Sequence, residues 1–219
     1  MAGSEPVSLK IDFISDVSCP WCAIGLNSLE EGLRRLDDAV EARVSLQPFE
    51  LNPDMVPEGE NIVDHISAKY GTDRARSAAT RDAIRSRATE VGFDFAMDDD
   101  SRIYNTFDAH RLLHWAELQG RHLALKHALF EAYFSRGESP ADHAVLTAAA
   151  GRAGLDPDAA RSVLEGGDYA EEVRAAELLW RQRGINSVPA VIVNDRYLIS
   201  GGQPADAYER ALREIMAAA

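Results

Sequence analysis

The 219-residue sequence is poor in cysteine and lacks any long apolar run, and each shortage excludes a class of protein. Cys19 and Cys22 are its only cysteines, so each can pair only with the other, with a metal or with a substrate. No stretch approaches the roughly 18–20 apolar residues that span a bilayer. The N-terminus lacks the basic and apolar regions of a secretory signal. We therefore expect a cytoplasmic protein with no membrane partner.

Basic residues are also in deficit, which argues against a nucleic-acid partner. Lysine and arginine total 23 against 36 aspartates and glutamates, a formal net charge of −13. Such a molecule repels phosphate backbones unless it has a local basic patch. The nearest approach is Arg81, Arg85 and Arg87, but Asp82 and Glu90 interrupt them, as on a solvated helix face. We expect no nucleic-acid binding.

The first part of the chain has the patterns of a β-α-β unit. Apolar and polar residues alternate over residues 7–13, which predicts a strand, and a helix follows from the cysteine motif. A second strand is predicted over Ala42–Leu51. Pro48 removes one ladder donor from it and so indicates a bulge or an edge strand.

Helical periodicity then runs from about Asn61 to Gly184. Ser139-Pro140 and Asp156-Pro157 each place a capping residue before a proline, which predicts the start of a helix. Gly166-Gly167 predicts a helix end, with Asp168 as the next N-cap. The acidic stretch 94–100 is expected to form a surface loop.

The chain returns to strand patterns near its end. Residues 189–193 and 197–199 read as two strands joined by a tight turn at Asn194-Asp195, and a last helix follows. The whole chain is therefore predicted to be an α/β protein with a helical insertion. We assign residues 1–60 and 184–219 to the α/β domain and residues 61–183 to the insertion.

The cysteine motif Cys19-Pro20-Trp21-Cys22 has the chemistry of disulfide exchange. With Pro20 as the first helical residue, Cys19 is the N-cap. Unpaired backbone N–H groups and the helix dipole stabilise a thiolate there and lower its pKa from about 8.5. We predict that Cys19 is the exposed attacking thiolate and Cys22 the resolving thiol. In a reducing compartment, a lone pair of this kind favours turnover over a structural bridge.

A zinc site is the structural alternative for these two thiols, and it needs two further ligands. The chain has no third cysteine. His110 with His114, or His122 with His127, have helical spacing but lie far along the chain. We predict no metal and no tightly bound cofactor. Pro20 and Trp21 carry no charge; Trp21 either presents an apolar face to a substrate or partly covers the insertion.

The sequence resembles the DsbA-like thioredoxin superfamily, and within it the cytoplasmic FrnE-type branch. Asp16–Cys22 matches the active-site turn of that family, Phe49–Pro53 its second-strand signature and Tyr104–Leu112 its insertion motif. Gly184–Pro189 matches the segment with the cis-proline, and Gly201–Pro204 the approach to the last helix. The resemblance implies a thioredoxin fold with a large all-helical insertion.

The resemblance also implies roles for further residues. Pro189 would be the cis-proline beside the cysteine pair, with the backbone of Val188 free to pair with an extended substrate. Asn105 and His110 would line the substrate cleft, although Asn105 could simply cap a helix and His110 could pack between helices. Asp16 would assist proton transfer from Cys22 or bond a nearby turn.

Three functions compete at this point. The leading prediction is a thiol–disulfide oxidoreductase acting on protein or small-molecule disulfides, with glutathione as a candidate co-substrate. The alternative is a glutathione-dependent isomerase or polyketide-tailoring enzyme related to 2-hydroxychromene-2-carboxylate isomerase. Those isomerases typically have a serine where Cys19 stands and lack the second cysteine. The third is a non-catalytic module that grips extended polypeptides. The oligomeric state, monomer or homodimer, stays open.

Overall fold

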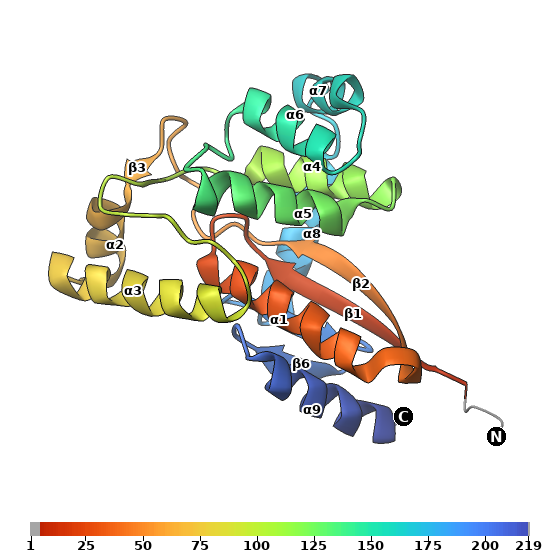
Figure 1. Ribbon diagram of the computed structural model, residues 1–219. Coiled ribbons are helices and arrows are strands. Elements are labelled where there is room, and N and C mark those ends of the chain that lie inside the picture. The colour runs from red at the N-terminus through yellow and green to blue at the C-terminus, as the bar shows by residue number, and fades with distance from the viewer. Residues whose placement is uncertain (1–4, 219) are drawn as a thin grey trace.

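The computed structural model describes residues 5–218, and a four-stranded mixed sheet lies at its centre (Figure 1). The strand order is β2 (Val40–Pro48), β1 (Val7–Ser15), β5 (Ala190–Val193), β6 (Tyr197–Ser200). β1 pairs in parallel with β2 and antiparallel with β5, and β6 is antiparallel to β5. The central strand β1 is therefore buried on both sides. Its run Ile11–Ile14 is apolar apart from Asp12, so the sequence indicates this burial only in part.

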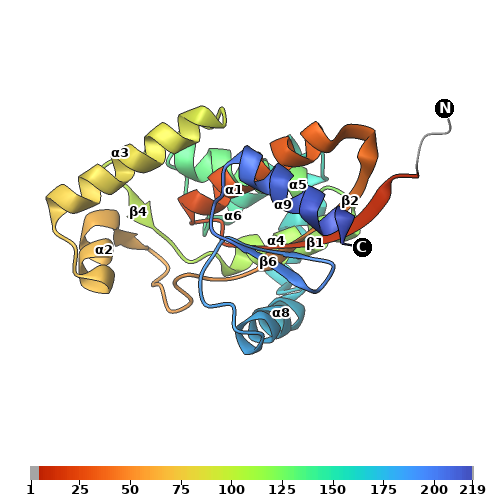
Figure 2. The same ribbon diagram turned by 90° about the horizontal axis from the view of Figure 1, so that it is seen from below.

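Helices cover both faces of this sheet (Figure 2). α1 (Pro20–Leu36) and α9 (Ala205–Ala217) pack together on one face. α8 (Ala170–Gln182) packs on β2 across the other face, where Trp180 joins a small cluster with Ile14 and Ala190. Burying one apolar face of the sheet and one stripe of each helix gives the α/β/α layering.

A short 3₁₀ turn, η1 (Asp37–Ala39), comes directly before β2. The remaining helices lie between β2 and β5 in sequence: α2 (Ile62–Tyr70), α3 (Arg74–Glu90), α4 (Phe107–Leu118), α5 (His122–Phe130), the π-helix η2 (Glu131–Ser135), α6 (His143–Arg152) and α7 (Pro157–Gly166). A short two-stranded ladder of β3 (Glu60–Asn61) and β4 (Arg102–Ile103) lies among them. Figure 1 shows α4–α7 as a layer above the sheet, with α2 and α3 to one side.

The inserted helices share a hydrophobic core with the sheet. The main cluster joins Phe13 of β1 and Leu26 of α1 to Phe130 and Phe134 of the insertion. A second cluster lies within α4–α7 and contains Leu112, Leu146 and Leu164 among others. Because the main cluster is continuous, the predicted division at residues 61 and 183 crosses packed side chains, and it stays a prediction.

Several local predictions are confirmed. Pro48 is the last residue of β2, which is an edge strand. Asn194 and Asp195 form the hairpin turn with φ of 52° and 55°, left-handed values that this residue type tolerates. Asp156 caps α7 ahead of Pro157.

Three local predictions are wrong. The second strand ends at Pro48, not Leu51, because the Leu51 N–H donates to the Asp16 carboxylate instead of a ladder partner. Ser139-Pro140 forms a turn, and the cap of the next helix is Asp142, whose side chain accepts from Ala144 N.

Asp168 is not the N-cap of α8. Its N–H donates to the Val163 carbonyl and completes the end of α7, so Tyr169, with φ of 62°, takes the cap position.

The acidic stretch 94–100 is a loop, as expected, but its two apolar residues are buried. Phe95 is 3% and Met97 4% exposed, and both join the main cluster beside Phe134. These two side chains hold the loop against the body of the protein. No helix within residues 5–218 has the length and apolarity to cross a bilayer.

Candidate active site

The cysteine motif occupies the first turn of α1, as predicted. Cys19 is the N-cap in extended conformation (φ −95°, ψ 112°) and Pro20 is the first helical residue. The Cys19 carbonyl accepts from Cys22 N (3.0 Å) and Ala23 N (3.3 Å), so both cysteines lie on one turn. Both are free thiols in this structure.

The expectation that Cys19 is exposed is wrong. Cys19 is 4% exposed and Cys22 is fully buried. Cys19 belongs to the main hydrophobic cluster, and the half-buried Trp21 and Val188 pack against the same cluster. The start of the helix determines the position of Cys19 on the turn. The burial of Cys19 depends on side chains distant in sequence, such as Val188.

The segment before β5 faces the cysteine pair. The Val188–Pro189 peptide bond is cis, and the Cys19 thiol donates to the Val188 carbonyl at 3.8 Å. The Pro189 carbonyl accepts from Gly201 N at 2.8 Å, which ties this segment to the chain after β6. Val188 N donates no hydrogen bond to another part of residues 5–218, so it is available to an added strand.

Gly202 lies directly against the backbone of the cysteine turn, which leaves no room for a side chain at this position. A Cβ at Gly202 would lie 2.8 Å from the Trp21 carbonyl oxygen. Because that contact is with backbone, we expect Gly202→Ala to displace the turn and to lower the free energy of unfolding by roughly 1–3 kcal/mol. Gly151→Ala is the matched control: Gly151 is an exposed position of α6, and its Cβ would meet the Pro157 side chain at 3.3 Å rather than backbone. Urea denaturation of both variants tests this, and equal stability would contradict it.

Asp16 organises the loop that leads into the cysteine turn. Its buried carboxylate accepts from Ser18 N (3.3 Å), Ser18 Oγ (3.0 Å) and Leu51 N (2.7 Å). Burial alone would raise its pKa, but the adjacent His110, the Leu51 N–H and the Thr106 hydroxyl lower the pKa to about 2. The carboxylate is therefore ionised at neutral pH and is a weak proton acceptor.

His110 and Asp16 are 94 residues apart in sequence but are neighbours in the structure. His110 is 3% exposed, and its Nε2 lies 3.5 Å from Asp16 Oδ1. Asn105 caps α4, since its Oδ1 accepts from Phe107 N at 2.9 Å, while its Nδ2 donates to the Pro53 carbonyl at 3.2 Å. Thus His110 and Asn105 hold together the segments that follow β1 and β2. Any contact of these two residues with a substrate stays a prediction.

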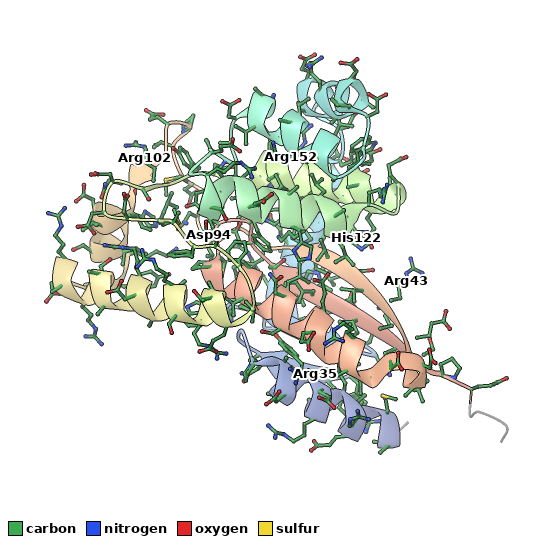
Figure 3. All side chains as sticks on the ribbon, viewed as in Figure 1. Arg35, Arg43, Asp94, Arg102, His122 and Arg152 are labelled. Carbon is green, nitrogen blue, oxygen red and sulfur yellow. The ribbon has the colours of Figure 1, made fainter. Side chains whose placement is uncertain are left out.

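Asn52 of the Phe49–Pro53 signature, and the histidines considered for a zinc site on α5, lie elsewhere. Asn52 Oδ1 accepts from Lys69 Nζ at 2.6 Å and lies 3.0 Å from His65 Nε2. Figure 3 shows His122 between α5 and β2, where its Nε2 lies 2.8 Å from the Val44 carbonyl. His127 contacts Glu30 at 2.8 Å. These histidines therefore hold helices and strand together, away from the cysteines.

Sequence reasoning missed Lys126 on α5. It is 1% exposed, and its charge acts on Cys22, Cys19 and Asp16. Burial lowers its pKa to about 8, and those three groups limit the lowering. A signal was present in the composition, because the chain has 20 arginines and only three lysines, Lys10, Lys69 and Lys126. Arginine stays charged in proteins, whereas a buried lysine can lose its proton.

Burial also raises the pKa of Cys22 well above its ordinary value. Cys19 adds to this effect, and the positive charge of Lys126 and the Asp16 backbone N–H oppose it. Cys22 therefore stays a thiol at neutral pH until a base removes its proton.

A second buried charged group lies where the chain leaves β2. Glu50 is 1% and Glu177 4% exposed, and the Arg174 guanidinium contacts both carboxylates. Burial and then repulsion from Glu177 raise the pKa of Glu50 to about 7. Arg174 also stacks on the Phe107 ring, 3.8 Å from its centroid, and so connects α8 to α4.

Glu50 makes stability depend on pH in a defined direction. Its pKa is higher in the folded protein than the ordinary 4.5, so folding favours the protonated form, and stability falls as pH rises from about 4.5 to about 7. We expect Glu50→Gln to flatten this fall in urea denaturation curves, whereas Glu41→Gln, on an exposed residue of β2, does not. Identical pH dependence in the Glu50 variant and the unmodified protein would contradict this.

Comparisons with known proteins agree with this geometry. The model of the DSBA-like thioredoxin domain matches residues 10–213. The crystal structure of the probable DsbA oxidoreductase SCO1869 from Streptomyces coelicolor is 33% identical, with a TM-score of 0.88 over 94% of this chain and 89% of that chain. The uncharacterized protein YwbO of Bacillus subtilis is 25% identical over 95% of this chain and 98% of its own length.

A more distant structure shares the fold. The cytosolic disulfide reductase DsbM from Pseudomonas aeruginosa, solved with GSH, is 15% identical, with a TM-score of 0.66 over 95% of this chain and 99% of that chain. The matched family model covers the sheet, the cysteine turn and the inserted helices alike. The chain therefore belongs to the DSBA-like thioredoxin domain family, with the thioredoxin fold and helical insertion of the DsbA-like oxidoreductases.

Proposed function

We propose that this protein is a thiol–disulfide oxidoreductase that uses Cys19 and Cys22. The observation that carries the proposal is the pair of free thiols on the first turn of α1, with the Cys19 thiol 3.8 Å from the Val188 carbonyl. Two cysteines spaced by one turn can close a disulfide and reopen it. Cys19 is the less buried of the two, 4% against 0% exposed, so it is assigned the first attack.

The reaction has two exchange steps. In the first, the Cys19 thiolate attacks a substrate disulfide; a Cys19–substrate disulfide forms, and the other substrate sulfur leaves and takes a proton from water. In the second, Cys22 loses its proton and attacks Cys19 Sγ, so the Cys19–Cys22 disulfide forms and the reduced substrate leaves. Two electrons pass from the cysteine pair to the substrate. A thiol of the cell, with glutathione as the candidate, returns them by the reverse sequence.

The substrate is proposed to bind as an extended segment beside Val188. Its free N–H and its carbonyl are the two groups that pair with an added strand. Pro20, Trp21 and Pro189 would give the apolar contacts around it. His110 is too deeply buried to touch a substrate in this conformation, so its proposed role is to hold Asp16.

Protein disulfides and small-molecule disulfides are both proposed substrates, and the cytoplasm is the proposed compartment. The FrnE-type assignment is also a proposal. The isomerase alternative gains no support from the site, because both cysteines are present and lie on one turn of α1.

Two measurements test the proposal. Reduced and oxidised protein should differ in mass by two hydrogens, with Cys19 and Cys22 joined in one peptide. Dithiothreitol-driven reduction of insulin should require both thiols. Redox titration in glutathione buffers then gives the direction, since about 30 mV corresponds to 1.4 kcal/mol for this couple. Insulin reduction that persists in the double serine variant would refute the proposal.

A further inference from the structure

Tyr208 of α9 connects the last helix to the segment that faces the cysteines. Its side chain is 0% exposed, and its hydroxyl donates to the Gly201 carbonyl at 3.2 Å. Burial raises the pKa of this phenol above its ordinary value, so the hydroxyl keeps its proton and stays a donor. The Gly201 N–H in turn donates to the Pro189 carbonyl at 2.8 Å. Hydrogen bonds therefore join Tyr208, through Gly201, to the segment Val188–Pro189.

Gly25 of α1 lies where this segment, the turn after β6 and Tyr208 meet. A Cβ at Gly25 would lie 3.1 Å from Pro189 Cγ and 3.3 Å from Gly202 Cα. The same Cβ would lie 3.5 Å from Tyr208 Oη. The first two distances are tighter than ordinary contacts, so an added methyl group would push a neighbour away. Pro189 therefore packs directly on the backbone of α1, at a place where α1 and α9 run side by side (Figures 1 and 2).

The segment held in this way carries the groups proposed to pair with an extended substrate. The Val188 carbonyl accepts from the Cys19 thiol at 3.8 Å, and the Val188 N–H donates no hydrogen bond to another part of residues 5–218. A backbone hydrogen bond needs a donor–acceptor distance of roughly 2.7–3.2 Å, so even a small shift of the segment weakens pairing with an added strand. The position of Val188 depends on what holds Pro189 next to it.

We propose that Tyr208 and Gly25 are positioning residues, which hold the Val188 backbone where an extended polypeptide substrate can pair with it. Both are buried, so they act on the substrate only through Gly201 and Pro189. A polypeptide disulfide depends on this arrangement because it presents a backbone. A small disulfide without a peptide backbone needs only access to the Cys19 sulfur. This inference rests on the proposed function, because it concerns how the substrate of that reaction is bound.

The test compares a substrate that has a peptide backbone with one that has none. The first is a short extended peptide whose cysteine carries 2-nitro-5-thiobenzoate in a mixed disulfide. The second is 5,5′-dithiobis(2-nitrobenzoate). In both, the Cys19 thiolate attacks a disulfide, a bond from Cys19 to the substrate sulfur forms, and the coloured thiolate leaves. Stopped-flow mixing of reduced protein with excess substrate gives the limiting rate and the half-saturating concentration of this first release.

Tyr208→Phe keeps the buried ring and removes only the hydroxyl. We expect it to raise the half-saturating concentration of the peptide by roughly 3- to 10-fold, the scale of one lost hydrogen bond between neutral groups. The limiting rate with the peptide, and the reaction with 5,5′-dithiobis(2-nitrobenzoate), should be unchanged. Gly25→Ala should change the peptide reaction in the same direction, because it displaces Pro189 or Gly202.

Each variant has a matched control. Tyr133→Phe removes a hydroxyl from another buried tyrosine, which donates to the Arg102 carbonyl at 2.9 Å from the inserted helices. Gly151→Ala adds a Cβ 3.3 Å from Pro157 Cγ, so it also crowds a proline ring, but on exposed α6. Both controls should leave the half-saturating concentration of the peptide unchanged. A rise in Tyr133→Phe equal to that in Tyr208→Phe would overturn the proposal, since general loosening of the core would then explain both.

The outcome for Tyr208→Phe decides the proposal even if Gly25→Ala does not fold, because the phenylalanine keeps every buried carbon atom of the tyrosine. An unchanged half-saturating concentration for the peptide would overturn it. Equal changes with both substrates would also overturn it, because they would indicate a disturbance at Cys19 itself. None of these results touches the proposed function. That function would instead be refuted by insulin reduction that continues without the two cysteines.

Discussion

Cys19→Ser is expected to abolish disulfide exchange, with a fall of roughly 10³-fold or more in insulin reduction, the scale typical of a lost nucleophile. A serine hydroxyl at this N-cap does not ionise at neutral pH and does not attack sulfur. The fold should persist, because serine is a favoured N-cap and Cys19 makes no side-chain cap of its own. Insulin turbidity with dithiothreitol measures the activity, and circular dichroism confirms folding.

Cys22→Ser is the partner variant and should behave differently. Cys19 can still attack, but no resolving thiol follows, so the mixed disulfide with the substrate accumulates. A stable adduct on Cys19, detected by mass spectrometry, is the expected result. If Cys22→Ser instead left no adduct and Cys19→Ser trapped the substrate, the assigned roles of the two cysteines would be reversed.

Asp16→Asn is expected to lower the free energy of unfolding at neutral pH by about 2–3 kcal/mol, the second-largest effect predicted here. The carboxylate is fully buried, and its pKa of about 2 lies below the ordinary 3.8, a difference that corresponds to roughly 2.5 kcal/mol. Because the folded-state pKa is lowered, this stability is present above pH 3.8 and is lost as pH falls towards 2. Urea denaturation at neutral and acidic pH measures both parts.

Asp38→Asn is the matched control, since Asp38 is an exposed aspartate of the short turn before β2. It should change stability by no more than about 0.5 kcal/mol, as most surface substitutions do. The same variants test the role of Asp16 in proton transfer. If Asp16 only positions the loop, Asp16→Asn should leave the pH profile of the resolving step unchanged. A shifted profile would instead identify Asp16 as a proton acceptor.

The two cysteines illustrate how far sequence reasoning extends into the site. Their shared turn, the cap at Cys19 and the helix start at Pro20 were predictable, because N-cap geometry and the fixed φ of proline act within a few residues. Their burial was not predictable in this way. It depends on Val188 and on the inserted helices, which meet the turn only after the chain has folded.

The errors at Asp168 and Ser139 have a related cause. Both residues have the preferences of an N-cap, yet each is engaged by a neighbouring turn. At Asp168 the preceding helix end takes the backbone N–H. Local preference is a weak guide where two turns compete for one residue, because the packing of the flanking helices decides between them.

The sequence by itself determined the order of the main strands and helices, the hairpin at Asn194-Asp195 and the pairing of the two thiols on one turn. All of these depend on contacts between residues that are near in sequence. Only the tertiary structure decided that His110 lies beside Asp16, that Lys126 is buried and that Glu50 shares Arg174 with Glu177. The physical reason is that the pKa of each group depends on its burial and on charges from distant segments, and neither exists until the core has formed.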